Sequence, residues 1–153
     1  MSGPSDWPLP DDGIRFIVPQ YLLDRLQKNV LTQGLYMRAV GYYPKAAGHR
    51  VDRVRHADDL FLYCVGGEGY LKVGDADYPV VAGDLIMLPQ GDAHAYGSSE
   101  ERPWTMYWVH FAGTDATAFW RYLGCTEDEH VARLGTNARL TAALESLVQV
   151  GTS

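Results

Sequence analysis

In the segment 83–97, the spacing of the residues indicates a binding or catalytic site more specifically than anywhere else in the sequence. It reads GDLIMLPQGDAHAYG and fits the pattern G-x5-P-x-G-x2-H. The pattern predicts a strand, a reversal at Pro89 and Gly91, and a returning strand. Because side chains alternate along a strand, His94 and Tyr96 share one face of the returning strand. An imidazole and a phenol on one inward face can bind a metal ion or a small polar molecule.

This segment resembles the second motif of the cupin superfamily. The metal-binding cupins have a first motif with two histidines, a glutamate and a downstream glycine. If Gly67 is that glycine, the glutamate position falls on Leu60, beside Asp59, and His56 is the one histidine of the paired-histidine region. A catalytic metal usually has three or more protein ligands. His56 and His94 are an incomplete set, so we expect no metal and no cofactor.

The run TMYWVHF, residues 105–111, predicts a further strand. Met106 and Trp108 share one face of it. An indole ring suits the C–H surface of a sugar or a planar ligand, and methionine forms an adaptable wall. The alternative is that Trp108 is simply a core residue. Both interpretations place it inside the fold.

Two arginines lie in the run HRVDRVRH, which precedes the strand predicted near residues 60–65. A guanidinium at the mouth of a barrel would bind a carboxylate or sugar hydroxyls. The run is equally typical of a solvated edge strand that is protected by its charges. The spacing leaves open whether Arg53 or Arg55 points inward.

Three other polar residues have simpler interpretations. His49 and His130 have no partner at a useful spacing, and we expect them on the surface. Asp92 could pair with His94, but an aspartate at this position is more typical of a turn.

The elements that must position these residues follow from local patterns. Between residues 35 and 112, short runs of β-branched and aromatic residues alternate with glycine, proline and aspartate, which predicts a sandwich or barrel. Gly74-Asp75 predicts a hairpin. Before the strands, Pro19 predicts the start of a helix over 19–30, and Trp7 is the one anchor of an N-terminal arm.

After Phe111 the spacing becomes helical. Thr114 can cap a first helix, Thr126 has the spacing of a capping box, and Asn137 can cap a last helix. The last helix has an apolar stripe made of Leu140, Leu144, Leu147 and Val148. We expect this stripe to pair with a second copy of the chain. The alternative is that the barrel covers it.

The composition is that of one ordinary globular domain. Of 153 residues, 46% are hydrophobic and 21% are charged, and the 19 acidic and 13 basic residues give a net charge of −6. An acidic chain is a poor match for nucleic acid. The sequence shows neither a signal peptide nor an apolar run long enough to span a membrane. Cys64 and Cys125 form no CxxC pair, which fits free thiols in a reducing cytosol.

A longer span resembles the N-terminal sensor half of AraC-type bacterial transcription regulators. The matching features are LYCVGGEGYLKVG, the turn at 83–97 and TMYWVHFAG. The resemblance implies a barrel that binds a small effector, helices that dimerise, and a pair of helix-turn-helix units expected outside this sequence. It also implies that Tyr96 and Trp108 line the effector site, as in the arabinose-responsive member. Met106 stands where that member has a histidine, which argues against arabinose itself.

We therefore predict a mainly β protein, with a cupin-like double-stranded β-helix (jelly-roll) barrel followed by C-terminal α-helices. An arm and short helix occupy 1–34, the barrel 35–112, and a helical dimerisation region 113–153. The predicted function is sensing of a small molecule, such as a sugar, by a dimeric cytoplasmic regulator without enzymatic activity. The alternatives are a metal-dependent cupin enzyme, such as a dioxygenase or isomerase, and a stand-alone carbohydrate-binding module. The predicted site residues are His94, Tyr96, Trp108, Met106, Arg53 and Arg55.

Overall fold

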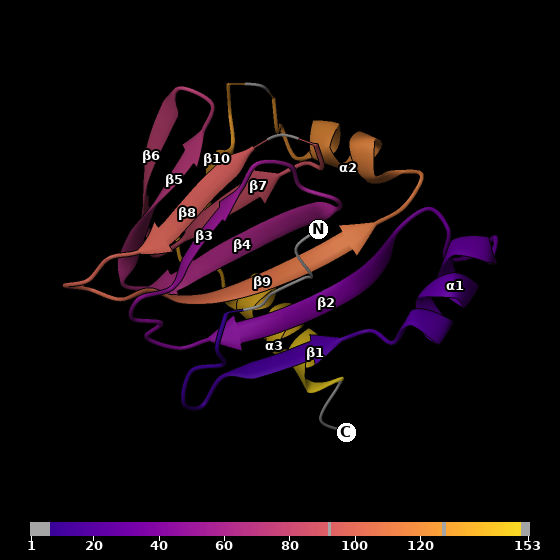
Figure 1. Ribbon diagram of the computed structural model, residues 1–153, viewed down its shortest axis with the longest axis horizontal. Helices are drawn as coiled ribbons and strands as arrows, with labels where there is room; N and C mark the ends of the chain where they lie inside the picture. The colour runs from indigo at the N-terminus through magenta and orange to yellow at the C-terminus, as the bar shows by residue number, and fades with distance from the viewer. Residues whose placement is uncertain (1–6, 92, 127, 151–153) are drawn as a thin grey trace.

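The computed structural model describes residues 7–91, 93–126 and 128–150. Within these ranges the strands form two antiparallel sheets, packed face to face (Figure 1). The six-stranded sheet has the order β1 (Ile14–Ile17), β2 (Tyr36–Tyr43), β9 (Thr105–Ala112), β4 (Asp59–Gly66), β7 (Asp84–Leu88) and β10 (Val131–Arg133). The four-stranded sheet has the order β3 (Arg50–Arg53), β8 (His94–Ser98), β5 (Glu68–Val73) and β6 (Ala76–Val81). The predicted sandwich or barrel is confirmed.

Tight turns set the register of the smaller sheet. β5 and β6 are joined at Gly74-Asp75, as predicted. Gly74 has a φ of +57°, a left-handed conformation that a two-residue hairpin turn favours. β8 begins at His94 and pairs with both β3 and β5. The turn before β8 therefore brings His94 and Tyr96 to the middle of this sheet.

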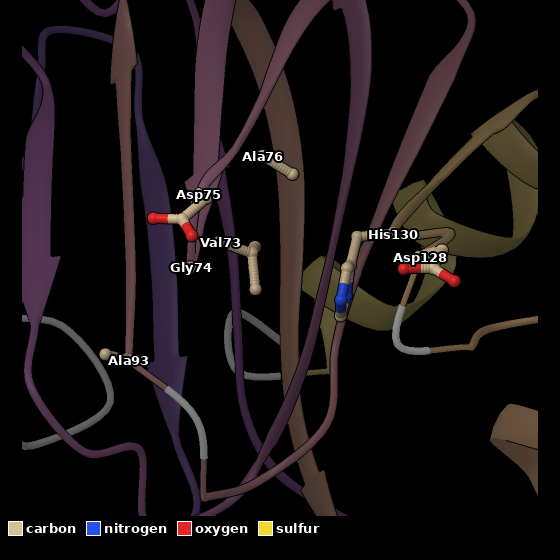
Figure 2. A pocket seen from close by; sticks show the side chains of 7 residues that line it. All are labelled: Val73, Gly74, Asp75, Ala76, Ala93, Asp128 and His130. Atoms are coloured by element: carbon tan, nitrogen blue, oxygen red, sulfur yellow. The ribbon is translucent and has the colours of Figure 1, made fainter.

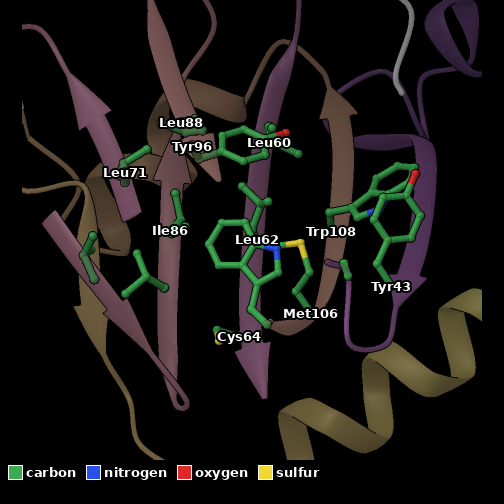
Figure 3. Close-up of a cluster of buried hydrophobic side chains, with 14 of the residues drawn as sticks. Tyr43, Leu60, Leu62, Cys64, Leu71, Ile86, Leu88, Tyr96, Met106 and Trp108 are labelled. Atoms are coloured by element: carbon green, nitrogen blue, oxygen red, sulfur yellow. The ribbon is translucent and has the colours of Figure 1, made fainter. Parts of the chain in front are cut away.

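Side-chain alternation along β9 builds two hydrophobic cores. Met106 and Trp108 point between the sheets, where they join an inner cluster (Figure 3). Tyr107 and Val109 point to the other face and join an outer cluster. The larger sheet is thus apolar on both faces, which explains why β9 reads as a nearly continuous apolar run.

Helix α3 (Ala138–Gln149) covers the outer face of the larger sheet. Asn137 caps it as predicted, because its side-chain oxygen accepts a hydrogen bond from the Leu140 backbone N–H at 3.0 Å. Leu144 is 1% exposed and Val148 4%. The sheet therefore covers these two residues of the stripe, as the alternative expected, and Leu140 and Leu147 pack partly buried against the same cluster. Pairing with a second copy stays a prediction.

Two local expectations after Phe111 are also wrong. Helix α2 (Ala116–Tyr122) begins after Asp115 rather than at Thr114, and it has no side-chain cap. The described residues of the segment that begins at Thr126 are not helical. The segment contains β10, which pairs with the edge of β7, where unpaired backbone groups favour an added strand over a short isolated helix.

The N-terminal segment contains helix α1 (Gln20–Lys28) with Pro19 at its N-cap, close to the predicted range. Trp7 is the predicted anchor, since its ring lies 5.4 Å from that of Tyr43 and 4.7 Å from that of His49. Residues 1–6 and 151–153, the outer ends of the predicted arm and helical region, lie outside the described residues. Cys64 and Cys125 are free, as predicted.

Candidate functional site

All five histidines of the chain are buried between or beneath the elements of the fold. The expectation that His49 and His130 lie on the surface is wrong, because they are 2% and 4% exposed. His49 Nδ1 accepts a hydrogen bond from Trp104 Nε1 at 3.1 Å. His130 Nδ1 lies 3.0 Å from the carbonyl oxygen of Met87. Each buried ring thus has the polar partner that makes its burial tolerable. Asp92 lies outside the described residues.

Arg53 reaches the predicted histidine and tyrosine from the neighbouring strand. It ends β3 directly opposite His94 of β8. Its Nη1 donates to the hydroxyl of Tyr96 at 3.1 Å and lies 3.2 Å from His94 Nε2. Since the guanidinium is always a donor, His94 Nε2 is the acceptor and the ring proton lies on Nδ1. These three residues form one buried polar group, which we call the arginine cluster.

The structure decides between the two arginines. Arg53 is 7% exposed and faces the interior. Arg55 lies beyond the end of β3, in an exposed position. A two-residue step along an extended chain would place both on one face. The pairing of β3 with β8 ends at Arg53, however, so the alternation of side-chain directions does not extend to Arg55. The assignment of Arg55 to the site is therefore not supported by its position.

Trp108 and Met106 form the wall of the interior opposite the arginine cluster. They are 3% and 0% exposed, and the Trp108 ring lies edge-on to Tyr43 at 5.5 Å (Figure 3). Gly41 of β2 lies opposite Trp108 in the ladder. A Cβ at this glycine would lie 2.2 Å from atoms of the indole ring, so glycine is what allows the ring to lie against β2. The indole Nε1 is buried and has no hydrogen-bond partner within residues 7–91, 93–126 and 128–150.

A second polar group adjoins the first, and we call it the aspartate cluster. Asp58 Oδ1 lies 3.1 Å from His56 Nε2 and 2.9 Å from His110 Nδ1. Its other oxygen accepts a hydrogen bond from Arg38 Nη1 at 2.7 Å. The β2–β9 register shifts at Arg38, and such a bulge re-aims a side chain. The rings of His56 and His94 are 4.7 Å apart, so the two clusters are in contact.

Burial decides the charge states in these clusters. Burial lowers the pKa of His94 to about 3, and the charge of His56 adds to the effect. Burial lowers the pKa of His56 to about 4 and outweighs the opposing charge of Asp58. For Asp58, burial acts to raise the pKa, but the hydrogen bond with His110 and nearby charges outweigh it, so the pKa is lowered. At neutral pH, neutral His56 and His94 therefore lie near an ionised carboxylate.

The position expected for a metal-binding glutamate contains no ligand. Leu60 is fully buried in the inner hydrophobic cluster. Asp59 lies on the other face of β4, where its Oδ1 accepts hydrogen bonds from Trp120 Nε1 at 2.7 Å and from the Gln90 backbone at 3.1 Å. Burial raises its pKa. Asp59 therefore fastens α2 to the sheet and is not part of the site.

An open hollow of about 700 Å³ lies elsewhere, at the β5–β6 turn (Figure 2). Asp75 lies on its hairpin side, and Asp128 and His130 lie on the other. None of the predicted site residues lines it. We assign the candidate site to the two buried clusters and to Trp108, whose ring lies 5.4 Å from that of His110. Among the described residues, this region holds the two buried side-chain atoms that have no hydrogen-bond partner, and it includes His56 and His94, whose pKa values are lowered.

Sequence reasoning missed two residues of the site. Asp58 and His110 of the aspartate cluster were not singled out. The alternation that grouped Met106 with Trp108 also includes His110, so that residue had a signal. Asp58 had none, because it precedes β4 in a loop.

Comparison with known proteins identifies the family. The AraC-like ligand binding domain matches residues 39–150. The chain belongs to this family. It is 39% identical to the MmsAB operon regulatory protein of Pseudomonas aeruginosa over 98% of this chain and 50% of that protein. The AraC-like domain thus spans half the length of this relative. The resemblance to AraC-type regulators is confirmed.

A solved structure of low sequence identity shares the fold. The protein YhaK from Escherichia coli has a TM-score of 0.52 and 15% identity, over 82% of this chain and 51% of that chain. ToxT K231A from Vibrio cholerae has a TM-score of 0.48 and 12% identity, over 72% and 46%. The family and the two sheets confirm the predicted cupin-like, mainly β fold with a C-terminal helix. Among the described residues, no helix is long and apolar enough to cross a membrane.

Proposed function

We propose that this AraC-like domain senses a small hydroxylated molecule, such as a sugar or a sugar acid, within the barrel. The observation that carries the proposal is a pair of buried polar atoms, Trp108 Nε1 and His56 Nδ1, that have no hydrogen-bond partner among the described residues. Buried polar atoms in folded proteins are nearly always paired. Both rings lie 5.4 Å from the ring of His110, so two unpaired atoms in one part of the interior point to a ligand that supplies the partners.

The chemistry of these two atoms selects the ligand. Trp108 Nε1 is a donor only. His56 Nε2 faces the Asp58 carboxylate at 3.1 Å, so the proton of the neutral ring lies on Nε2 and Nδ1 is an acceptor. A hydroxyl group accepts from the first and donates to the second. An alkyl group does neither, and an ionised carboxylate cannot donate.

The arginine cluster supplies a second anchor. The guanidinium of Arg53, with Tyr96 and His94 beside it, is suited to bind a further oxygen of the ligand, either a hydroxyl or a carboxylate. The indole face of Trp108 and the side chain of Met106 suit the C–H surface between these oxygens. A polyhydroxylated ligand uses all of these contacts together.

Ligand binding would be transmitted through Trp7. Its ring contacts His49, and His49 contacts the Tyr96 ring at 5.8 Å. An effector that contacts Tyr96 can therefore change how firmly the N-terminal segment is held. It can shift that equilibrium only by its differential affinity for the two arrangements.

The regulatory setting is also a proposal. The relative named as an operon regulatory protein supports a non-enzymatic, cytoplasmic regulator. In such a protein, a DNA-binding half outside this sequence would respond to a homodimer of sensor domains.

Matched ligands and variants test the function. Thermal shift and calorimetry with sugars, sugar acids and their deoxy analogues should find a binder whose deoxy analogue binds at least tenfold more weakly. Arg53→Gln and Tyr96→Phe should weaken it at least tenfold, and Trp108→Phe should weaken it while keeping a ring. Arg55→Gln is the exposed control and should bind like the parent. If Arg53→Gln and Arg55→Gln bind equally, the site is elsewhere.

A further inference from the structure

The aspartate cluster has the donor atoms of a metal site, although neither cupin motif predicted it. His56, Asp58 and His110 each offer one ligand atom, and these atoms all lie within 4.8 Å of one another. All three residues are buried, with exposed fractions of 4%, 4% and 2%. His56 and Asp58 come from the loop before β4, whereas His110 comes from the middle of β9.

We infer that His56, Asp58 and His110 bind one divalent transition-metal ion, through His56 Nε2, an Asp58 oxygen and His110 Nδ1. The inference does not rest on the proposed function, although both involve the ring of His56. Two imidazoles and one carboxylate are a recurring set for such ions and leave coordination positions open. The expectation of no metal depended on the motif positions and missed two of these three residues.

The distances support coordination. Ligand nitrogens and oxygens lie about 2.0–2.2 Å from such an ion, so two neighbouring ligands at right angles lie about 3 Å apart. Asp58 Oδ1 is 3.1 Å from His56 Nε2 and 2.9 Å from His110 Nδ1. An ion would replace the hydrogen bonds that now join these atoms, without a large movement of the backbone.

Neighbouring residues orient the ligands. Arg38 holds the second oxygen of Asp58 at 2.7 Å, which fixes the carboxylate in the way that outer-shell partners do at metal sites. The positive charges of Arg38 and Arg53 oppose a cation that binds mainly by charge. We therefore expect ions that bond strongly to imidazole, such as Zn²⁺ and Co²⁺, and no binding of Mg²⁺ or Ca²⁺.

The unpartnered atom of His56 is a second observation that points to this site. With an ion on Nε2, the ring proton moves to Nδ1, which then becomes a donor that faces the interior. A histidine ligand normally donates its other N–H to a partner. Water or an added ligand would supply that partner here, so occupation of the metal site would change the hydrogen bonding available next to Trp108.

Metal titration tests the inference without any effector. Protein treated with a chelator and dialysed should bind one Co²⁺ per chain, with visible absorption bands that Zn²⁺ abolishes and Mg²⁺ does not. Asp58→Asn and His110→Gln should reduce affinity for Co²⁺ at least tenfold. His130→Gln, which removes a buried histidine outside the cluster, is the matched control and should bind like the parent.

A measurement on the unmodified chain keeps the inference testable if the variants do not fold. In ¹⁵N spectra of the histidine side chains, Zn²⁺ should shift His56 Nε2 and His110 Nδ1 at one equivalent and leave His130 unchanged. Absence of binding at a tenfold excess of Zn²⁺ and Co²⁺ would overturn the inference. Equal binding by His110→Gln and the parent would do so as well.

Discussion

At the scale of single residues, His49 shows what a buried base contributes to this fold. Its ring lies among Trp7, Tyr43, Tyr96 and Trp104, and its Nδ1 accepts the hydrogen bond from Trp104 Nε1. Burial lowers the pKa of His49 to about 4, and the charge of Arg53 adds to the effect. A proton on Nδ1 would turn the acceptor into a donor that faces another donor.

Protonation of His49 should therefore lower the free energy of unfolding as the pH falls. Its folded pKa is about 4 against a usual value of 6.5, so the unfolded chain binds more protons between these values. The contribution is fully present above pH 6.5 and is lost as the pH falls toward 4. The linkage relation gives a loss of about 2 kcal/mol between pH 7 and pH 5. Denaturant unfolding at several pH values measures it.

The control for this prediction is His49→Gln, which keeps an acceptor for Trp104 but does not titrate in this range. The parent should lose more stability on acidification than the variant, by about the amount given above. If parent and variant lose the same amount of stability, His49 does not carry this pH dependence.

The titratable and charged groups that face His49 from other elements are Arg53, Tyr43 and Tyr96.

Part of the candidate site could be predicted residue by residue. The turn motif indicated His94 and Tyr96, and alternation indicated Trp108 and Met106; all four lie in the interior. Which arginine points inward depends on the residue at which β3 stops pairing with β8. No local sequence pattern indicates that residue. Asp58 reaches His110 only because β4 and β9 are neighbours, which is a fact of long-range pairing.

At the scale of elements, the close approach of β2 and β9 at Gly41 determines the shape of the interior. The Cβ of an alanine there would lie 2.2 Å from the indole of Trp108. Gly41→Ala should therefore displace this ring and destabilise the fold by about 1–3 kcal/mol, as overpacking does. Thermal melts and tryptophan fluorescence measure the two effects.

Gly66→Ala is the matched control in the same sheet, because its nearest neighbour, Thr105 Cβ, is 3.7 Å from the added atom. It should change stability and fluorescence much less than Gly41→Ala. An unchanged melting temperature and emission spectrum in Gly41→Ala would show that the ring does not depend on this glycine.

Helix α3 belongs to the fold of the domain. Leu144 is 1% exposed and packs in the outer cluster. Leu144→Ala should lower the free energy of unfolding by about 2–5 kcal/mol, the usual loss for a buried leucine. Denaturant melts check this, with the exposed Ser146→Ala as the control. A loss below 0.5 kcal/mol would show that the sheet does not need this helix.

The elements could be predicted where the local signal is strong. The hairpin at Gly74-Asp75, the helix near Pro19 and the cap at Asn137 depend on neighbouring residues, and each is confirmed. β10 was missed because three residues carry little pattern of their own. Its position depends on the free edge of β7, a partner distant in sequence.

At the scale of the whole molecule, the two sheets bring together residues from four separate strands and one loop. The arginine cluster comes from the smaller sheet, and Trp108 and His110 come from the larger one. A change in the spacing of the sheets therefore acts on both clusters at once. The proposed effector, if it binds between the sheets, would act by this route on α3, which lies on the other side of the larger sheet.

The charge of the whole chain leads to a last prediction about DNA. Specific complexes depend on lysine and arginine contacts that release counterions from phosphate, and this chain has a net charge of −6. Regulators bind their operators with dissociation constants of about 10⁻⁸–10⁻¹¹ M. The 153-residue chain should give no sequence-specific gel shift with DNA upstream of its own gene at physiological salt. A longer chain that also contains the proposed DNA-binding half would be the positive control. A specific, salt-sensitive shift by the 153-residue chain would mean that the sensor domain itself contacts the operator.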